Sequence, residues 1–336
     1  MGAHNSRPRR SKKTSIKKTS INKTSIKKIS SAPIPSTPLP SQSPSNLLPK
    51  TLSLDEITSR ITAHEPSLTV LDLTTWDLKP AAMISLTSAL ATNSTLTSLT
   101  LSRNNLKDGG IDHLAEALKI NSTLSTLYLA RSCVDDEAIA HLAEALKSNF
   151  TLVFLDLSIN EITAQGAVSL AEGLKYNTTL TLLDLSFNKL EDRGATHFAE
   201  ALRVNSTLTT LFLVGADVNN NGVGQIAESL KVNSTLDYLA LRYNSFGPIG
   251  LASLAAALSD NSALKRLDLF GNNFSQSHVH SFMDAMVENS SLVHLTLTSP
   301  IFPETHPFLD RNDHNLLERK ATLVSMLLSH LSFLVD

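Results

Sequence analysis

The sequence predicts an α/β solenoid, in which one parallel inner β-sheet is covered on its outer side by α-helices. Three leucines, Leu96, Leu99 and Leu101, stand in the spacing L-x-x-L-x-L, and this triplet returns every 28 residues. It occurs nine times between residues 68 and 297 without an insertion, and all 27 of these positions are leucine. A fixed period of this length is typical of stacked repeats. We therefore expect one continuous core that grows along an axis, and not two separate globular domains.

Residues 1–50 are predicted to form a disordered tail that is basic at first and then rich in Pro and Ser. A five-residue unit, KKTSI, begins at residue 12 and returns with small changes at residues 17, 22 and 27. The tail has eleven Lys or Arg and no acidic residue, so the remaining chain has 29 − 11 = 18 basic against 31 acidic residues. Few apolar side chains and a high like charge cannot offset the entropy lost on folding. The tail and the body therefore have different electrostatic partners.

Residues 51–67 are expected to contain a short helix that covers the first strand. Ser53 and Glu56 fit a capping box, in which each side chain accepts a hydrogen bond from the backbone N–H of the other residue. The helix should end before Pro66. Such a cover protects the edge of a sheet from pairing with another chain.

Residues 68–300 consist of nine repeats, each with a strand half and a helix half. The last two leucines of each triplet alternate with other residues, as a strand with one buried side requires. Parallel strands need a long crossover, which is usually a helix. In residues 110–119, one helical face carries Ile111, Leu114, Ala115 and Leu118.

An asparagine separates each helix from the next strand. Because Asn tolerates the left-handed conformation that often ends a helix, we expect it to end these helices in that way. The same loops match the N-glycosylation pattern, which we interpret as a by-product of turn chemistry. The repeated residues include Asn93, Asn121, Asn177, Asn205 and Asn233.

Past Pro300 the period ends, and residues 301–336 are predicted to be a C-terminal cap. The run from Asp313 to Leu328 leads from polar residues into an apolar segment. Because terminal repeats of a solenoid need a cover, we expect an amphipathic closing helix here.

The extended pattern L-x-x-L-x-L-x-x-N-x-L resembles the ribonuclease-inhibitor-like class of leucine-rich repeats, over roughly residues 53–300. The resemblance implies a horseshoe-like leucine-rich repeat solenoid that binds proteins, as in the sensor region of nucleotide-binding immune receptors and in GTPase-activating proteins for Ran. The ladder asparagine of the family matches Asn104, Asn160, Asn188, Asn244 and Asn272. It is replaced by Trp76, Ser132, Ala216 and Pro300, where we expect turns with different hydrogen bonds.

The repeats contain no residue set typical of a catalytic or metal centre, and we expect neither an enzyme nor a cofactor. His113, His141 and His197 share one repeat position, but two stacked imidazoles do not supply the three or four ligands of a metal site. Cys133 has no neighbouring motif that would activate a thiol. On the outer helix face, Glu and Lys recur three residues apart, as in Glu116 and Lys119, and indicate solvated ion pairs.

The inner strand face carries the residues that we predict to bind a partner protein. Aromatic and arginine side chains dominate binding energy at interfaces, and they gather in repeats four to eight. The N-terminal strands hold small polar residues instead, for example Ser98 and Thr126. The predicted partner-binding residues are Tyr128, Phe154, Asp156, Asp184, Phe212, Tyr238, Arg242, Arg266, Asp268, Phe270 and His294.

The extreme N-terminus matches the myristoylation pattern M-G-x-x-x-[ST], with Gly2 as the acceptor. One lipid chain binds membranes only marginally, so the following basic residues would supply a second attraction to acidic lipids. Residues 9–13 also fit a nuclear import signal, and a basic tail can bind RNA. Four serines follow lysines, as basophilic kinases prefer, and would switch the tail off when phosphorylated: Ser15, Ser20, Ser25 and Ser30.

These observations together predict a non-catalytic, monomeric interaction scaffold, cytoplasmic and tethered to a membrane through its tail, with the nucleus as an alternative location. Its expected partners are a protein and acidic lipids, and not nucleic acid. A regulator of a small GTPase, similar to the Ran GTPase-activating proteins, is the alternative function. In that case Arg103 or Arg131 would be the candidate catalytic arginine, although no acidic tail follows the repeats.

Overall fold

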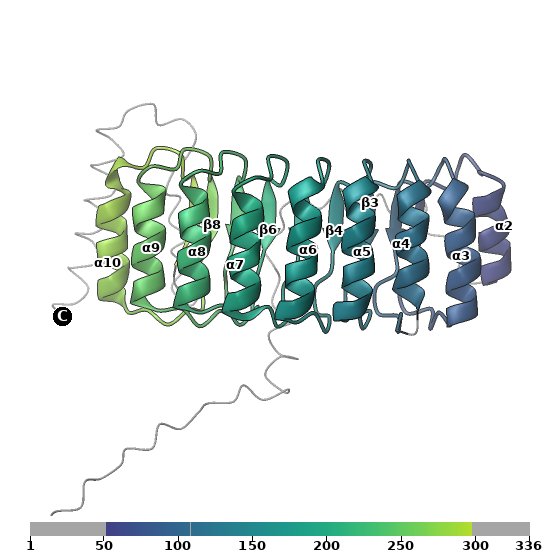
Figure 1. Cartoon of the computed structure of the whole chain (residues 1–336), viewed down its shortest axis with the longest axis horizontal. Helices are drawn as coiled ribbons and strands as arrows, with labels where there is room; N and C mark the ends of the chain where they lie inside the picture. The colour runs from purple at the N-terminus through teal and green to yellow at the C-terminus, as the bar shows by residue number, and fades with distance from the viewer. Residues whose placement is uncertain (1–51, 108, 298–336) are drawn as a thin grey trace, which may run out of the picture. The chain divides into compact units, whose positions relative to one another are not determined.

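The computed structural model describes residues 52–107 and 109–297. In these residues a unit of one strand and one helix repeats along the chain. The helices stand side by side in chain order, and the strands form a second layer behind them (Figure 1). In the described residues the sheet has nine strands, all parallel and in the order of the chain. The predicted fold class, a leucine-rich α/β solenoid, is therefore confirmed.

Each repeat contributes one short strand and one helix. The strands are β1 (Val70–Asp72), β2 (Ser98–Thr100), β3 (Thr126–Tyr128), β4 (Phe154–Asp156), β5 (Leu182–Asp184), β6 (Thr210–Phe212), β7 (Tyr238–Ala240), β8 (Arg266–Asp268) and β9 (His294–Thr296). The helices are α2 (Leu54–Thr62), α3 (Pro80–Thr92), α4 (Gly110–Ile120), α5 (Asp136–Ser148), α6 (Ala164–Tyr176), α7 (Glu191–Leu202), α8 (Asn220–Leu230), α9 (Pro248–Leu258) and α10 (Gln276–Ala285), and a 3-10 turn η2 (Met286–Glu288) follows α10.

Helix α2 begins as the sequence predicts. The Ser53 hydroxyl accepts from the Glu56 N–H at 3.2 Å, and the Glu56 carboxylate accepts from the Ser53 N–H at 2.7 Å. These two bonds satisfy backbone donors that the first turn of a helix leaves free. Ile57 and Ile61 are fully buried, so α2 is part of the core.

The leucine ladder fills the space between the two layers. Every ladder leucine from Leu68 to Leu292 is at most 6% exposed, while Leu295 and Leu297 are half-buried. Neighbouring strands pair with a constant offset of 28 residues, so Leu71 lies opposite Leu99. The equal length of the repeats thus stacks leucine on leucine along the whole described solenoid.

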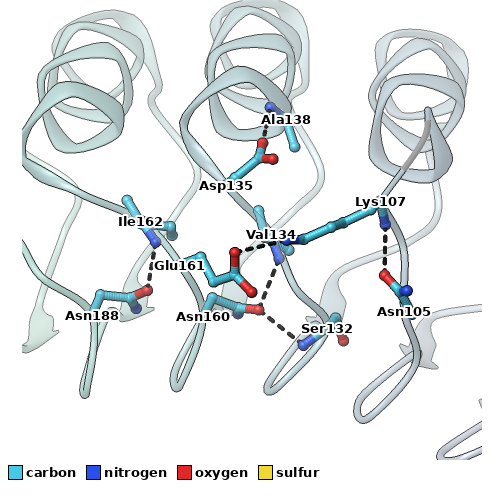
Figure 2. Close-up of polar contacts among 10 residues, drawn as sticks. All are labelled: Asn105, Lys107, Ser132, Val134, Asp135, Ala138, Asn160, Glu161, Ile162 and Asn188. Carbon is cyan, nitrogen blue, oxygen red and sulfur yellow. Dashed lines mark hydrogen bonds and ion pairs between the residues drawn. The ribbon is translucent and has the colours of Figure 1, made fainter.

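The ladder asparagines join successive repeats, as Asn160 illustrates in Figure 2. Its side-chain nitrogen donates to the carbonyls of Leu129 and Leu157, both at 2.8 Å. Its oxygen accepts from the N–H groups of Ser132 at 2.9 Å and Val134 at 3.1 Å. This partly buried amide therefore bonds these four backbone groups from two repeats, which is why this residue type recurs.

The turns without this asparagine are built differently, as expected. Residues Asp77, Cys133 and Asp217 directly follow the replacements Trp76, Ser132 and Ala216, and their φ angles are 53°, 59° and 59°. The corresponding residues after the five ladder asparagines do not have positive φ. These turns thus contain an additional left-handed residue, while the asparagine of the next repeat still accepts from their backbone, as Asn160 accepts from the Ser132 and Val134 N–H groups. Pro300 lies outside the described residues.

The asparagines at the helix ends correct one prediction. We expected a left-handed residue, but Asn121 is extended, with φ −65° and ψ 132°. Its side chain instead caps the helix of the preceding repeat and shapes the following loop: the nitrogen donates to the Leu90 carbonyl of α3 at 2.7 Å, and the oxygen accepts from the Leu124 N–H at 2.8 Å. Because this amide is only 4% exposed and already bonded, it is poorly placed for glycosylation.

Candidate functional site

The predicted partner-binding residues lie on the inner face of the sheet, which we define as the residues that alternate with the ladder leucines. Three columns of side chains run across the strands on this face. Phe154, Tyr238, Arg266 and His294 begin their strands; Tyr128, Asp156, Asp184, Phe212 and Asp268 end theirs; Arg242 and Phe270 stand two residues farther on.

Four of the aromatic side chains are more buried than predicted. Tyr128, Phe154, Phe212 and Tyr238 are 9%, 5%, 8% and 8% exposed, although they lie on the face away from the helices. Cross-strand packing is the reason, because residues on adjacent parallel strands are within ring-contact distance. The rings of Tyr128 and Phe154 are 4.8 Å apart, and those of Phe212 and Tyr238 are 5.0 Å apart. We therefore expect alanine at Phe212 or Tyr238 to lower stability, and not only partner binding.

The centre of the inner face is a small apolar cluster. Phe212, Tyr238 and Ala240 are buried against one another, and the half-buried Leu182 and Val214 pack against them. This cluster is separate from the core between the layers. It therefore holds the aromatic rings in fixed positions on the side of the sheet away from the helices.

Two aspartates lie side by side on one flank of this cluster. Asp156 and Asp184 are in register on β4 and β5, and each accepts a 2.8 Å hydrogen bond from the N–H two residues later, that of Ser158 or Ser186. Burial raises the pKa of both carboxyl groups, and burial together with the charge of Asp156 raises the pKa of Asp184 to about 7. Neither has an ion-pair partner within the described part of the chain. Their hydrogen bonds also shape the turn after each strand, so these residues have a structural role too.

The other flank holds Arg242, whose side chain is only 16% exposed. Its Nε lies 3.3 Å from the Asp268 carboxylate, and its guanidinium stands 5.1 Å from the ring centre of Phe270 and 5.6 Å from that of Tyr243. Burial raises the pKa of Asp268 to about 6, against the opposing effect of Arg242. The Arg242 guanidinium therefore lies beside two aromatic rings and one carboxylate, that of Asp268.

Arg266 is the second arginine on the flank that holds Arg242. Its guanidinium lies 4.8 Å from the Tyr238 ring and donates to the Asp237 carboxylate at 2.8 Å, and Lys265 contacts the same carboxylate at 2.9 Å. Partial burial alone would raise the pKa of Asp237, but the hydrogen bonds from Lys265 and Arg266 lower it. Burial, and then the charge of Asp268, raises the pKa of Tyr238 to about 12.

Sequence reasoning missed several contributors to this face. Leu182 and Val214 occupy the same columns as the predicted residues, and Asp237 and Tyr243 lie beside them. Reading each column position by position, and not only its aromatic or charged members, would have found the two aliphatic residues. His294 is exposed on β9.

The remaining candidates lie elsewhere. His141 contacts Asp112 at 2.6 Å and His197 contacts Glu200 at 3.3 Å, and in the described residues no group of three or more His, Cys, Asp or Glu is placed to hold a metal. Arg103 and Arg131 are exposed loop residues with positive φ, and no observation supports a catalytic role for either.

The predictions for the two ends of the chain concern residues that the structure does not describe. The myristoylation site Gly2 and the serines Ser15, Ser20, Ser25 and Ser30 lie outside the described residues, and so does the expected closing helix. Within the described part, no helix has the length and apolar character needed to cross a membrane.

Comparison with known proteins agrees with the repeat architecture. The family model "Leucine Rich repeat" matches residues 92–115, 148–171, 176–199 and 232–255, whose starting points differ by multiples of 28. The search of curated proteins gave no match. Among solved structures, the chain is similar to leiomodin-1 actin-binding site 2, with 22% identity over 49% of this chain and 80% of that chain and a TM-score of 0.34.

A second similar structure is the tropomodulin C-terminal domain from Caenorhabditis elegans, with 13% identity over 54% of this chain and 93% of that chain and a TM-score of 0.37. The matched segments share their spacing with the leucine ladder, and the ladder in turn positions the nine parallel strands and their helices. The chain therefore contains leucine-rich repeats at a spacing of 28 residues, and its described residues form a solenoid with nine parallel strands.

Proposed function

We propose that the protein is a non-catalytic scaffold that binds a partner protein on the inner face of strands β4 to β8. The observation that carries this proposal is the in-register pair of Asp156 and Asp184, which has no cation beside it in the described structure. A partner that brings a Lys or Arg between them would relieve their mutual repulsion. Solenoids of this kind commonly bind along such extended inner surfaces.

The neighbouring side chains support the same proposal. The aromatic rings of Phe212 and Tyr238 are held by each other, so they lose little conformational freedom when a partner binds. Arg242 and Phe270 offer a partly buried cation and an aromatic ring at the opposite flank. The inner face thus has an apolar centre between an acidic flank, with Asp156 and Asp184, and a flank that carries Arg242. Such a face favours a partner that has a basic group opposite the two aspartates and an acidic group opposite Arg242.

The experiment compares two faces of one molecule. Wild type, an inner-face variant (Asp156→Asn with Asp184→Asn), Phe270→Ala, and an outer-face control (Glu172→Ala with Glu228→Ala) are used to capture proteins from cells. A protein held by wild type and by the control is then purified and its affinity measured. Each inner-face change should weaken binding by about 1–3 kcal/mol, with the control unchanged. Equal losses from both faces would contradict the proposal.

We also propose that the N-terminal tail tethers this scaffold to acidic membranes through a lipid on Gly2 and the basic residues that follow. The support is the sequence pattern and the charge of the tail. Labelling with a myristate analogue should mark wild type and not Gly2→Ala. Glu at Ser15, Ser20, Ser25 and Ser30 should release labelled protein from vesicles that contain phosphatidylserine, since the added charge opposes the basic residues.

A further inference from the structure

One edge of the solenoid carries a row of exposed apolar side chains that the inner face does not involve. Ile120, Tyr176, Val204 and Val232 are 66%, 63%, 62% and 60% exposed. Each directly precedes the asparagine of the loop that follows its helix, so all four lie at the edge where helices end and strands begin. Phe150, 65% exposed, and Val153, 41% exposed, belong to the loop before β4 at the same edge.

These residues are not scattered. In the described residues eight large apolar side chains are exposed, and only Ile84 and Ile249 lie away from this edge. Because the repeats have no insertion, residues at the same place in successive repeats stand level with one another. Helices in contact are about 8–10 Å apart, so the row from Ile120 to Val232 extends over roughly 30–40 Å.

A basic residue precedes each of the four apolar residues: Lys119, Lys175, Arg203 and Lys231. Glutamates come three residues earlier still, and the lysines contact them, as Lys119 contacts Glu116 at 2.6 Å and Lys231 contacts Glu228 at 2.6 Å. Three helical residues correspond to about 4.5 Å, so the backbone of each Glu lies farther from the edge than that of its Lys, while the charged ends of the two side chains meet. From the edge inward the order of backbone positions is therefore apolar, basic and acidic.

When this edge is dehydrated, few of its backbone carbonyl groups lose a hydrogen-bond partner. The last carbonyls of a helix normally need water or a side chain. Here the buried asparagine of the next repeat donates to one of them, for example Asn149 to the Leu118 carbonyl at 2.7 Å and Asn205 to the Leu174 carbonyl at 2.8 Å. Dehydrating this edge therefore leaves these carbonyls paired.

We propose that this edge lies on an acidic lipid surface, with the apolar row in the boundary between headgroups and acyl chains and the basic row at the headgroups. Single apolar side chains at regular intervals, each followed two residues later by an exposed Ser122, Thr178, Ser206 or Ser234, suit a flat and deformable surface. A protein partner would need a matching pocket for each. The surface is independent of the inner face, which stays open to its own partner.

The test uses the full chain with Gly2→Ala, so that no lipid chain is attached. Partition onto phosphatidylcholine vesicles with and without phosphatidylserine is measured for this parent and for a fourfold edge variant, Ile120→Ser, Tyr176→Ser, Val204→Ser and Val232→Ser. Polar residues already occupy this place at Thr92, Ser148 and Asp260, so the variant should fold. The matched control is Ile84→Ser with Ile249→Ser. All three proteins share the same basic tail, so a difference between them belongs to the edge.

The edge variant should lose at least about tenfold in partition onto the acidic vesicles, and the control should bind like its parent. A second readout is tryptophan emission: Tyr176→Trp should shift to shorter wavelength and be quenched by brominated lipid, whereas Ile249→Trp should not. Equal partition of the edge and control variants, or no lipid quenching of Tyr176→Trp, would overturn the proposal. Loss of self-association or of a protein partner with unchanged vesicle binding would assign the edge to a protein instead.

Discussion

The two faces of the sheet differ in how strictly the repeat constrains them. On the side facing the helices, every repeat places leucine at the same three positions, and these side chains are buried almost completely up to Leu292. On the inner face, the same column reads Thr100, Tyr128, Asp156, Asp184 and Phe212 in successive repeats. The side chains that face the helices must be the same in every repeat, because each leucine packs on the equivalent leucines of the two neighbouring repeats. The other side is free to differ, so it can encode recognition.

The largest effect should come from breaking the leucine side. Leu183→Asp would bury an unpaired charge between stacked repeats, which costs several kcal/mol, and we expect the repeats around β5 to unfold. Thermal and denaturant unfolding measure the loss. Thr126→Asp, which adds the same charge on the half-buried inner face of β3, is the matched control and should cost far less. Wild-type stability of Leu183→Asp would contradict the ladder assignment.

The next effect tests whether inner-face aromatics also stabilise the fold. Phe212→Ala and Tyr238→Ala should each lower the free energy of unfolding by about 1–3 kcal/mol, since both rings are buried in a small apolar cluster. A double-mutant cycle should give a coupling of about 0.5–1.5 kcal/mol, because the rings meet edge to face at 5.0 Å. Additive losses would mean that the two rings do not depend on each other.

The sequence predicted the leucine side well and the inner face only in part. A leucine ladder, the capping box of Ser53 and Glu56 and the ladder asparagines are regular patterns, and their partners lie at fixed offsets of 3, 26, 28 or 31 residues. The burial of Phe212 depends instead on which ring occupies the next strand, and the capping role of Asn121 depends on a carbonyl in the preceding repeat. Such contacts require the relative placement of repeats. The side-by-side placement of Asp156 and Asp184 follows from their offset of 28 residues, but the burial that raises the pKa of Asp184 was not visible in the sequence.

A smaller effect concerns the ladder asparagines, which connect successive repeats. Asn160→Ala removes one amide that serves four backbone groups, so some of them lose their partner, and we expect a loss of about 1–3 kcal/mol. Asn105→Ala, close by in Figure 2, is the control, because its side chain is exposed and accepts a single 3.3 Å bond from Lys107. Chemical unfolding of both variants provides the comparison. Equal stabilities would show that water replaces the ladder amide without cost.

The smallest effect is a pH dependence that belongs to the inner face alone. The pKa of Asp184 is raised in the folded protein, from 3.8 to about 7, so between about pH 4 and pH 7 the folded state binds more protons than the unfolded state. Stability should therefore fall as pH rises through this window, and Asp184→Asn should remove part of the fall. The Asn oxygen can still accept from the Ser186 N–H, which keeps the turn intact. Because solvent reaches this face and screens the pair, we expect a difference of only about 1 kcal/mol. Unfolding free energies of wild type and variant at pH 4, 5.5 and 7 give the two slopes. Parallel slopes would mean that Asp184 titrates normally, and the aspartate pair would then have no stored repulsion for a basic partner to relieve.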